Sequence, residues 1–160
     1  VSATTPSSQL GEAERWQASN VPNGTPGFET KLSYTQWAKQ TYGSPTTPGS
    51  SPGDIANGTS DSNLVLYAQG ADLTNKVVRQ ASFMTVNDEL LATFTYQVRS
   101  NLSDVTITTE ASDDLINWKR DTSIVTSNPQ ANGVTYITVR AATPTLSGGK
   151  YFRLSVEINP

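Results

Sequence analysis

Apolar side chains recur at every second position from Val77 onward, and this period constrains the fold more than any other feature of the sequence. The stretch 90–98, LLATFTYQV, alternates in this way, and so does the stretch 105–111, VTITTEA. A period of two is that of a β-strand with one buried face. The turn-forming clusters SNLSD, SDDL, NPQANG and LSGGK separate the runs. The pattern predicts a mainly β chain, with an immunoglobulin-like or jelly-roll-like antiparallel β-sandwich of about seven strands between residues 77 and 158.

The alternation also assigns side chains to faces. In the stretch 90–98, one face is predicted to hold Leu90, Ala92, Phe94, Tyr96 and Val98, and the other face to hold Leu91, Thr93, Thr95 and Gln97. In the final run, YFRLSVEI, the predicted inner side chains are Phe152, Leu154, Val156 and Ile158.

Two short helices are expected ahead of the strands. Residues 28–42 carry apolar side chains at helical spacing and are followed by Gly43, which is suited to ending a helix. Residues 62–69 predict a second helix, with a Ser or Asp N-cap before it and Gly70 after it. The stretch between them, SPTTPGSSPG, is typical of a linker.

The N-terminal residues form a third kind of segment. They are rich in Ser, Thr, Pro and Gly and could not bury enough apolar surface to fold alone. We therefore divide the chain into an extended arm, 1–27, a helical and loop segment, 28–75, and a β-sandwich, 76–160. The arm is expected to lie against its own domain or a neighbouring subunit, with Leu10 and Trp16 as apolar anchors at a subunit interface.

Composition excludes several kinds of chemistry. Without Cys and His, the chain has no disulfide, no thiolate ligand or nucleophile, and no imidazole base. The net charge is -3 and the Lys and Arg residues are scattered, which argues against nucleic-acid binding. No apolar run approaches the ~18 residues of a membrane-spanning helix. The chain begins at Val1, for which removal of a leader is one interpretation and a boundary chosen in cloning is another.

Two motifs carry a family resemblance. The stretch ASDDLINWKRD fits a pattern S-x-D-L-x-x-W, and the last strand fits R/Y-F-x-R-L-x-V; the matching residues are Ser112, Asp114, Leu115 and Trp118, then Tyr151, Phe152, Arg153, Leu154 and Val156. The chain thereby resembles the C-terminal β-sandwich module of large secreted proteins from Verrucomicrobia and Planctomycetes. Members often carry, ahead of this module, a helix with a Trp and a thrombospondin-type-3-like calcium loop, matched here by Trp37, Asn63, Leu64, Tyr67, Ala68 and Gly70. The resemblance covers roughly residues 28–160 and implies an extracellular scaffold without known activity.

The stretch GDIANGTSDSNLVLYAQGADL carries oxygen-bearing side chains at the close spacing of a calcium loop. Asp54, Asn57 and Asp61 are its candidate ligands. Where the resembled loop has acidic ligands, this chain has residues such as Ile55 and Leu66. Because the charge of the ligands sets the affinity for calcium, we expect weak calcium binding at most. The expected structure is a turn whose Asx and Ser side chains cap the following helix, and no other cofactor is expected.

Two further groups of residues are candidates for chemistry or binding. The adjacent carboxylates Asp88 and Glu89, and Asp113 and Asp114, could do acid–base work, although adjacent pairs in turns are usually solvated. Trp118 is either a platform on which a glycan stacks or, as the preferred interpretation, a side chain that packs on the core or sheet. No residue is predicted to be catalytic.

The leading hypothesis is a non-enzymatic structural protein of the bacterial cell exterior, whose copies assemble into a filament or surface layer. The arm would add as a strand to the exposed sheet edge of a neighbouring copy, where backbone hydrogen bonds supply affinity. Because the arm alternates poorly, a clamp in extended or short helical form is the alternative. The alternative is a carbohydrate-binding or adhesive module of a larger secreted protein, with glycans as partners. A hydrolase that uses carboxylates is a third hypothesis, weakened by the absence of His.

Overall fold

The computed structural model describes residues 31–56, 58–71, 73, 77–143 and 149–159. The fold below belongs to the compact unit Leu32–Pro160. Its elements are α1 (Tyr34–Tyr42), α2 (Asn63–Ala68), β1 (Arg79–Val86), β2 (Glu89–Arg99), β3 (Val105–Ser112), β4 (Thr122–Pro129), β5 (Val134–Ala141) and β6 (Tyr151–Ile158).

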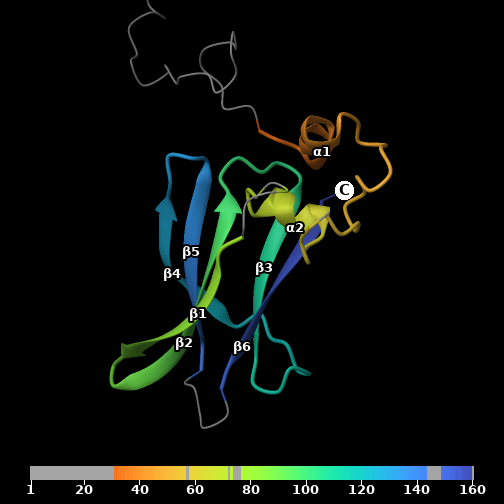
Figure 1. Ribbon diagram of the computed structural model, residues 1–160. Helices are drawn as coiled ribbons and strands as arrows, with labels where there is room; N and C mark the ends of the chain where they lie inside the picture. The colour runs from red at the N-terminus through yellow and green to blue at the C-terminus, as the bar shows by residue number, and fades with distance from the viewer. Residues whose placement is uncertain (1–30, 57, 72, 74–76, 144–148, 160) are drawn as a thin grey trace, which may run out of the picture. The chain divides into compact units, whose positions relative to one another are not determined.

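The strands form two sheets of unequal width (Figure 1). One sheet has four strands in the order β1-β2-β5-β4, and the other has two strands, β3 and β6. Every pair of neighbouring strands is antiparallel. The expected mainly β class, with antiparallel sheets and two short helices, is confirmed. The expected count of about seven strands is wrong for the part of the chain described, which has six. The immunoglobulin-like or jelly-roll-like subtype stays a prediction.

The first helix begins and ends at recognisable capping residues. The Ser33 side chain accepts a hydrogen bond from the Gln36 backbone, and the Gln36 side chain accepts one from the Ser33 backbone. This reciprocal pair is a capping box, and it sets the start of α1 at Tyr34 rather than at residue 28. At the other end, Gly43 adopts a left-handed conformation with φ 81° and donates to the Lys39 carbonyl, as its position predicts.

The second helix differs from the expectation at its start. Ser62 occupies the N-cap position of α2, but its side chain makes no capping hydrogen bond, so the prediction of a side-chain cap is wrong there. Gly70, just beyond the end of α2, has φ 67°, in the left-handed region that favours glycine. A Cβ at Gly70 would lie 2.5 Å from the Val134 side chain, so this position also needs a residue without one.

The helices share a core of their own. Its buried members are Tyr34, Trp37, Ala38, Ala56, Leu66, Tyr67 and Ala71. Asp104, just before β3, ties this core to the sheets: one carboxylate oxygen accepts from the Tyr34 backbone N–H at 2.7 Å, and the other is a partner of the Tyr67 hydroxyl. A carboxylate at this place also complements the positive N-terminal end of α1.

The sheets share a second core. Phe94, Tyr96 and Val139 are buried in it, and half-buried side chains from both sheets pack around them: Val98, Ile107, Ile137, Phe152 and Leu154. The rings of Phe94 and Phe152 stack across the gap between the sheets, with centroids 5.5 Å apart and planes 9° apart. The predicted inner face of β2 is thus confirmed at Phe94 and Tyr96.

Side chains on one face are not all buried to the same extent. Leu90, on the same face as Phe94, is 50% exposed, whereas Leu91 and Gln97 on the opposite face are buried. Ile158, expected inside, is 43% exposed. A period of two identifies the faces of a strand, but it does not say how far the opposing layer extends over each face.

Leu66 gives a test of the helical core. It is 1% exposed, so Leu66→Ala should lower the free energy of unfolding by about 2–5 kcal/mol through lost burial and an unfilled cavity. The matched control is Leu115→Ala, because Leu115 is 55% exposed and a surface truncation should change stability by roughly 0.5 kcal/mol or less. Urea unfolding followed by circular dichroism measures both; equal effects would contradict the assigned core.

Candidate functional site

The calcium-like loop uses its carboxylates internally. Asp61 forms an ion pair with Arg79, with 2.8 Å between carboxylate oxygen and guanidinium nitrogen. Asp54 accepts a hydrogen bond of 2.9 Å from the backbone N–H of Ser51. Asn57, the third candidate ligand, lies outside the described residues. Within the described stretches, no three acidic side chains gather as a metal site would require.

Asn63 holds the loop together from the start of α2. Its side chain is fully buried and donates to the carbonyls of Gly49 and Ser51 at 2.8 and 2.9 Å. Its side-chain oxygen accepts from the Tyr42 hydroxyl. Residues 44–53, expected to be a linker, are therefore bound to both helices, because Tyr34 also donates its hydroxyl to the Ser50 carbonyl. These hydrogen bonds hold the loop in place. Leu66, at a position where the resembled calcium loop has an acidic ligand, is buried in the helical core.

Calcium binding is directly testable. We expect that millimolar calcium leaves the Tm unchanged within about 1 °C, since a ligand raises the Tm only when it binds the folded state. Differential scanning calorimetry with calcium, magnesium and a chelator measures this. A rise of several degrees that is specific to calcium and lost in the Asp54→Asn variant would show a working site.

The turn after β3 is organised by one carboxylate. Asp114 accepts from the backbone N–H groups of Ile116 and Asn117 at 2.9 and 2.7 Å, from the Asn117 side-chain amide at 2.7 Å, and from the Ser112 hydroxyl at 3.0 Å. The hydrogen bonds, first of all that from the Asn117 backbone, hold the pKa of Asp114 well below its usual range. Leu115 takes a left-handed backbone conformation with φ 62°. This turn displays two apolar side chains, since Leu115 is 55% and Ile116 79% exposed.

Trp118 lies on the outer side of the smaller sheet. The Arg153 guanidinium stands 4.4 Å from its ring centroid, a cation–π contact. Arg153 also binds Glu110 at 2.6 Å, and Arg120 approaches the other oxygen of Glu110 at 3.4 Å. The hydrogen bond from Arg153 lowers the pKa of Glu110. Trp118 is half-buried, and Arg153 stands over one face of its ring; its proposed role in binding a glycan stays a prediction.

The other carboxylates face no common cleft. Asp88 lies in the β1–β2 turn with φ 63° and is exposed, as is Glu89. Asp113 pairs with Lys150 at 2.7 Å, while Asp114 turns into its own loop. Neither adjacent pair therefore aims two carboxyl groups at one point, as glycoside hydrolysis requires.

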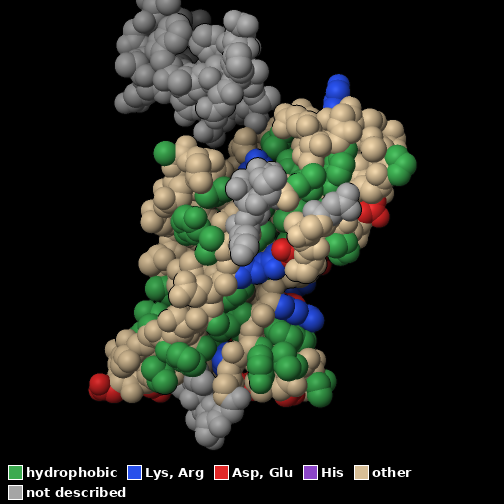
Figure 2. Space-filling view, in the orientation of Figure 1, with side chains coloured by type: hydrophobic (Ala, Val, Ile, Leu, Met, Phe, Trp, Pro, Cys, Tyr) green, Lys and Arg blue, Asp and Glu red, His purple; other side chains and the backbone are tan. Residues whose placement is uncertain are grey.

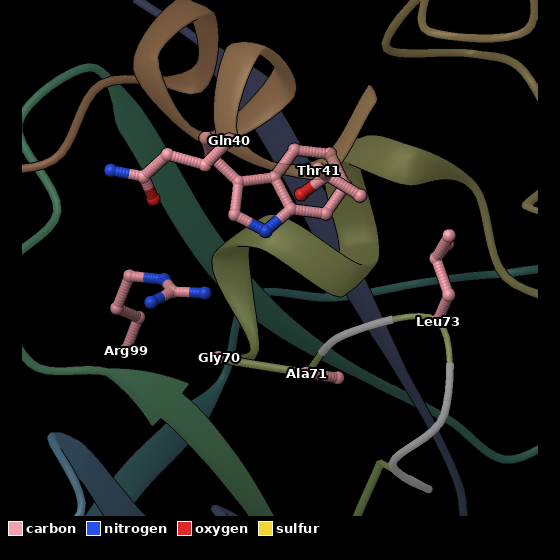
Figure 3. Close-up of a pocket in the computed structure, with 7 residues that line it drawn as sticks. Gln40, Thr41, Gly70, Ala71, Leu73 and Arg99 are labelled. Atoms are coloured by element: carbon pink, nitrogen blue, oxygen red, sulfur yellow. The ribbon is translucent and has the colours of Figure 1, made fainter. Parts of the chain in front are cut away.

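An open hollow of about 490 Å³ lies between α1 and the end of β2 (Figure 3). Its lining is Trp37, Gln40, Thr41, Gly70, Ala71, Leu73 and Arg99. Arg99 is its only charged side chain among these and already donates to the Tyr67 carbonyl at 3.0 Å. Burial lowers the pKa of Arg99. The lining offers an amide, a hydroxyl and one cation, and no acid–base pair.

The edges of the wider sheet carry both polar and apolar exposed side chains. β1 and β4 are the two edge strands of the wider sheet, and seven of the eight residues of β4 are exposed. The exposed apolar side chains include Phe83 and Leu90 on the β1–β2 hairpin and Ile124 on β4. Figure 2 shows apolar side chains at the surface over the hairpin, at the lower left, and over the turn after β3, at the lower right. The sequence did not predict the exposure of these residues, because alternation shows which side chains share a face and not how much of that face is covered.

Comparison with known proteins adds no relative. No protein-family model, no curated protein and no solved structure matches the chain. The helices within the described residues are all too short or too polar to cross a membrane. The interface candidates Leu10 and Trp16 lie outside the described residues.

The Asp114 turn makes a pH prediction. Because the folded-state pKa of Asp114 is depressed, its stabilising effect is present above the unfolded pKa, roughly 4, and is lost as the pH falls through the folded value. Asp114→Asn should therefore lower the Tm at pH 7, and the difference from the wild type should shrink below about pH 4. Asp88→Asn, in an exposed turn that Asn also tolerates, is the control. Equal Tm values for wild type and Asp114→Asn at pH 7 would contradict this role.

Proposed function

We propose that this chain is a non-enzymatic structural protein of the bacterial cell exterior, whose copies assemble into a filament or surface layer. Each copy adds its N-terminal arm, residues 1–27, to a sheet edge of its neighbour, with Leu10 and Trp16 as anchors. The contact is head-to-tail, and a head-to-tail contact that does not close produces a fibre. The family resemblance to secreted Verrucomicrobia and Planctomycetes proteins belongs to the same proposal.

One observation carries the proposal: four strands on one side face only two on the other. A sheet of two strands cannot cover the inner face of a sheet of four, and apolar side chains on that face stay exposed at Phe83, Leu90 and Ile124. Natural proteins usually blunt exposed edges with charges, prolines or bulges. β4 carries a register shift between Ile124 and Thr126 and ends in Pro129, whereas β6 pairs with β3 without irregularity.

The second candidate function is a carbohydrate-binding or adhesive module. It is favoured by Tyr151, which is 42% exposed and belongs to the same strand as Arg153, the partner of the Trp118 ring. Aromatic side chains next to a charged network are suited to stacking and hydrogen bonding with a sugar. Binding to a glycan array that is lost in Trp118→Ala, by a protein that stays monomeric, would favour this candidate over assembly.

Deletion of residues 1–20 tests the proposed assembly. Every buried side chain of the two described cores lies between residues 34 and 139, so the truncated chain should stay folded. We expect the full chain to form large species by size-exclusion chromatography with light scattering, and the truncated chain to elute as a folded monomer. The double variant Leu10→Ser, Trp16→Ser should behave like the truncation, and Ser7→Ala, Ser8→Ala like the wild type. Assembly that survives the truncation would refute the arm mechanism.

A further inference from the structure

The strand order points to one vacant position. The seven-strand immunoglobulin-type sandwich has sheets A-B-E-D and C-F-G. The order β1-β2-β5-β4 corresponds to A-B-E-D, and β3-β6 corresponds to C-F. A seventh strand would lie beside β6, and none of the described strands occupies that place.

The hydrogen bonds show which groups of β6 face this vacant place. Asn159 donates its backbone N–H to the Asp104 carbonyl at 2.8 Å, so this pair belongs to the hydrogen-bonded set of the antiparallel ladder. Hydrogen-bonded and non-hydrogen-bonded pairs alternate along an antiparallel ladder, so residues 151, 153, 155 and 157 of β6 bond to β3. The backbone N–H and C=O groups of Phe152, Leu154, Val156 and Ile158 therefore point to the opposite edge. Within the described residues, these groups make no backbone hydrogen bond, and the described element beside β6 other than β3 is the short helix α2.

This edge lies on the side of the sandwich where apolar surface is uncovered. The other edge of β3 is occupied, because Ala111 and Lys119 exchange two backbone hydrogen bonds of 2.9 Å and the chain continues from there to β4. Since β4 and β1 are opposite edges of the wider sheet, the open edge of β6 faces the β1 side. On that side, Phe83 and Leu90 share the inner face with Phe94 and are 57% and 50% exposed. In Figure 1 the hairpin that carries them runs away from β6.

The inner side chains of β6 are also incompletely covered. Phe152, Leu154 and Val156 are only half-buried, although Phe152 stacks on Phe94. An added strand along β6 would satisfy its free backbone groups and cover these side chains together with Phe83 and Leu90. It would turn β6 from an edge strand into a central one.

We infer that the open edge of β6 is the acceptor for a strand donated by the N-terminal arm of a second copy of this chain. This inference rests on the proposed function and assigns its docking place. Thirty residues precede the described part of the chain, and an extended segment of that length spans on the order of 100 Å. That reach is sufficient for a neighbouring molecule. Within the arm, Trp16 is the large apolar side chain proposed as an anchor, and a ring of that size suits the uncovered strip beside Phe83 and Leu90.

Hydrogen exchange of the full chain tests the acceptor edge residue by residue. In dilute, dissociated protein, the amides of Phe152, Leu154, Val156 and Ile158 should exchange fast, while those of residues 153, 155 and 157 exchange slowly. In the assembly, the four fast amides should slow by on the order of 100-fold. The amides of Ala81, Phe83 and Thr85, which face the free edge of β1, should stay fast and serve as the control.

Each other outcome overturns a different statement. A chain that stays monomeric at every concentration refutes the proposed function. A chain that assembles while the four β6 amides remain fast refutes this acceptor edge and leaves assembly standing. Protection of the four amides already in the monomer shows that the chain's own segment fills the edge, and refutes donation by a second copy.

A pair of proline variants gives an independent check. Val156→Pro removes an N–H that faces the open edge and leaves the hydrogen bonds to β3 intact. It should abolish assembly while the far-ultraviolet circular dichroism stays that of the wild type. Thr85→Pro makes the same change at the edge of β1 and should assemble normally. Assembly by Val156→Pro but not by Thr85→Pro would overturn the assignment; if Val156→Pro does not fold, the exchange measurement decides.

Discussion

The stacking of Phe152 on Phe94 joins two sheets that differ in width by a factor of two, and the rest of the molecule depends on that mismatch. Burial of apolar surface drives the sheets together, but a pair of strands covers only part of the opposing four. The contact is complete near Tyr96 and Val139, which are 5% and 2% exposed. It fails toward the β1–β2 turn, where Phe83 and Leu90 remain at the surface. The sandwich is therefore closed at its centre, and apolar side chains stay exposed at one side.

The helical half of the unit shows a different solution to a related problem. Its loop has the spacing of a calcium loop. Asn63 donates hydrogen bonds to two backbone carbonyls of the neighbouring loop, and Asp61 forms an ion pair with Arg79. The buried amide of Asn63 makes three hydrogen bonds, so its burial costs little. Tyr67 and Asp104 then connect this half to the sheets. Asp104 thereby ties the helical half of the described unit to its sheets.

Much of the fold follows from local sequence signals. Period-two alternation predicts β2 and β6, and Gly43 predicts the end of α1, because these signals depend only on neighbouring residues. The exposure of Ile158 and the burial of Gln97 depend on what lies opposite each strand, which no local pattern encodes. The packing of the loop 44–53 was likewise missed, because its order comes from Asn63 and Tyr34, distant in sequence.

The sequence predicts the kind of contact at the candidate site but only one of its two sides. The sequence suggested that backbone pairing between copies replaces chemistry, but it named only the donor, Leu10 and Trp16. The acceptor edge proposed above depends on the strand order and on which residues of β6 bond to β3, and both are tertiary facts. The position of Trp118 after a turn predicts packing on the core or sheet. Its partner Arg153 lies 35 residues further along the chain, so no local pattern identifies it.

The most direct measurement of the central claim is an intermolecular one. A spin label attached at residue 17, as the variant Gln17→Cys, is suited to a chain that has no other cysteine. Labelled copies are mixed with isotopically enriched, unlabelled copies, so that broadening of amide resonances reports contacts between different molecules. The account predicts that broadening is strongest along β6, around Leu154 and Val156. Broadening confined to β1 or β4, or none at all in an assembled sample, would contradict it.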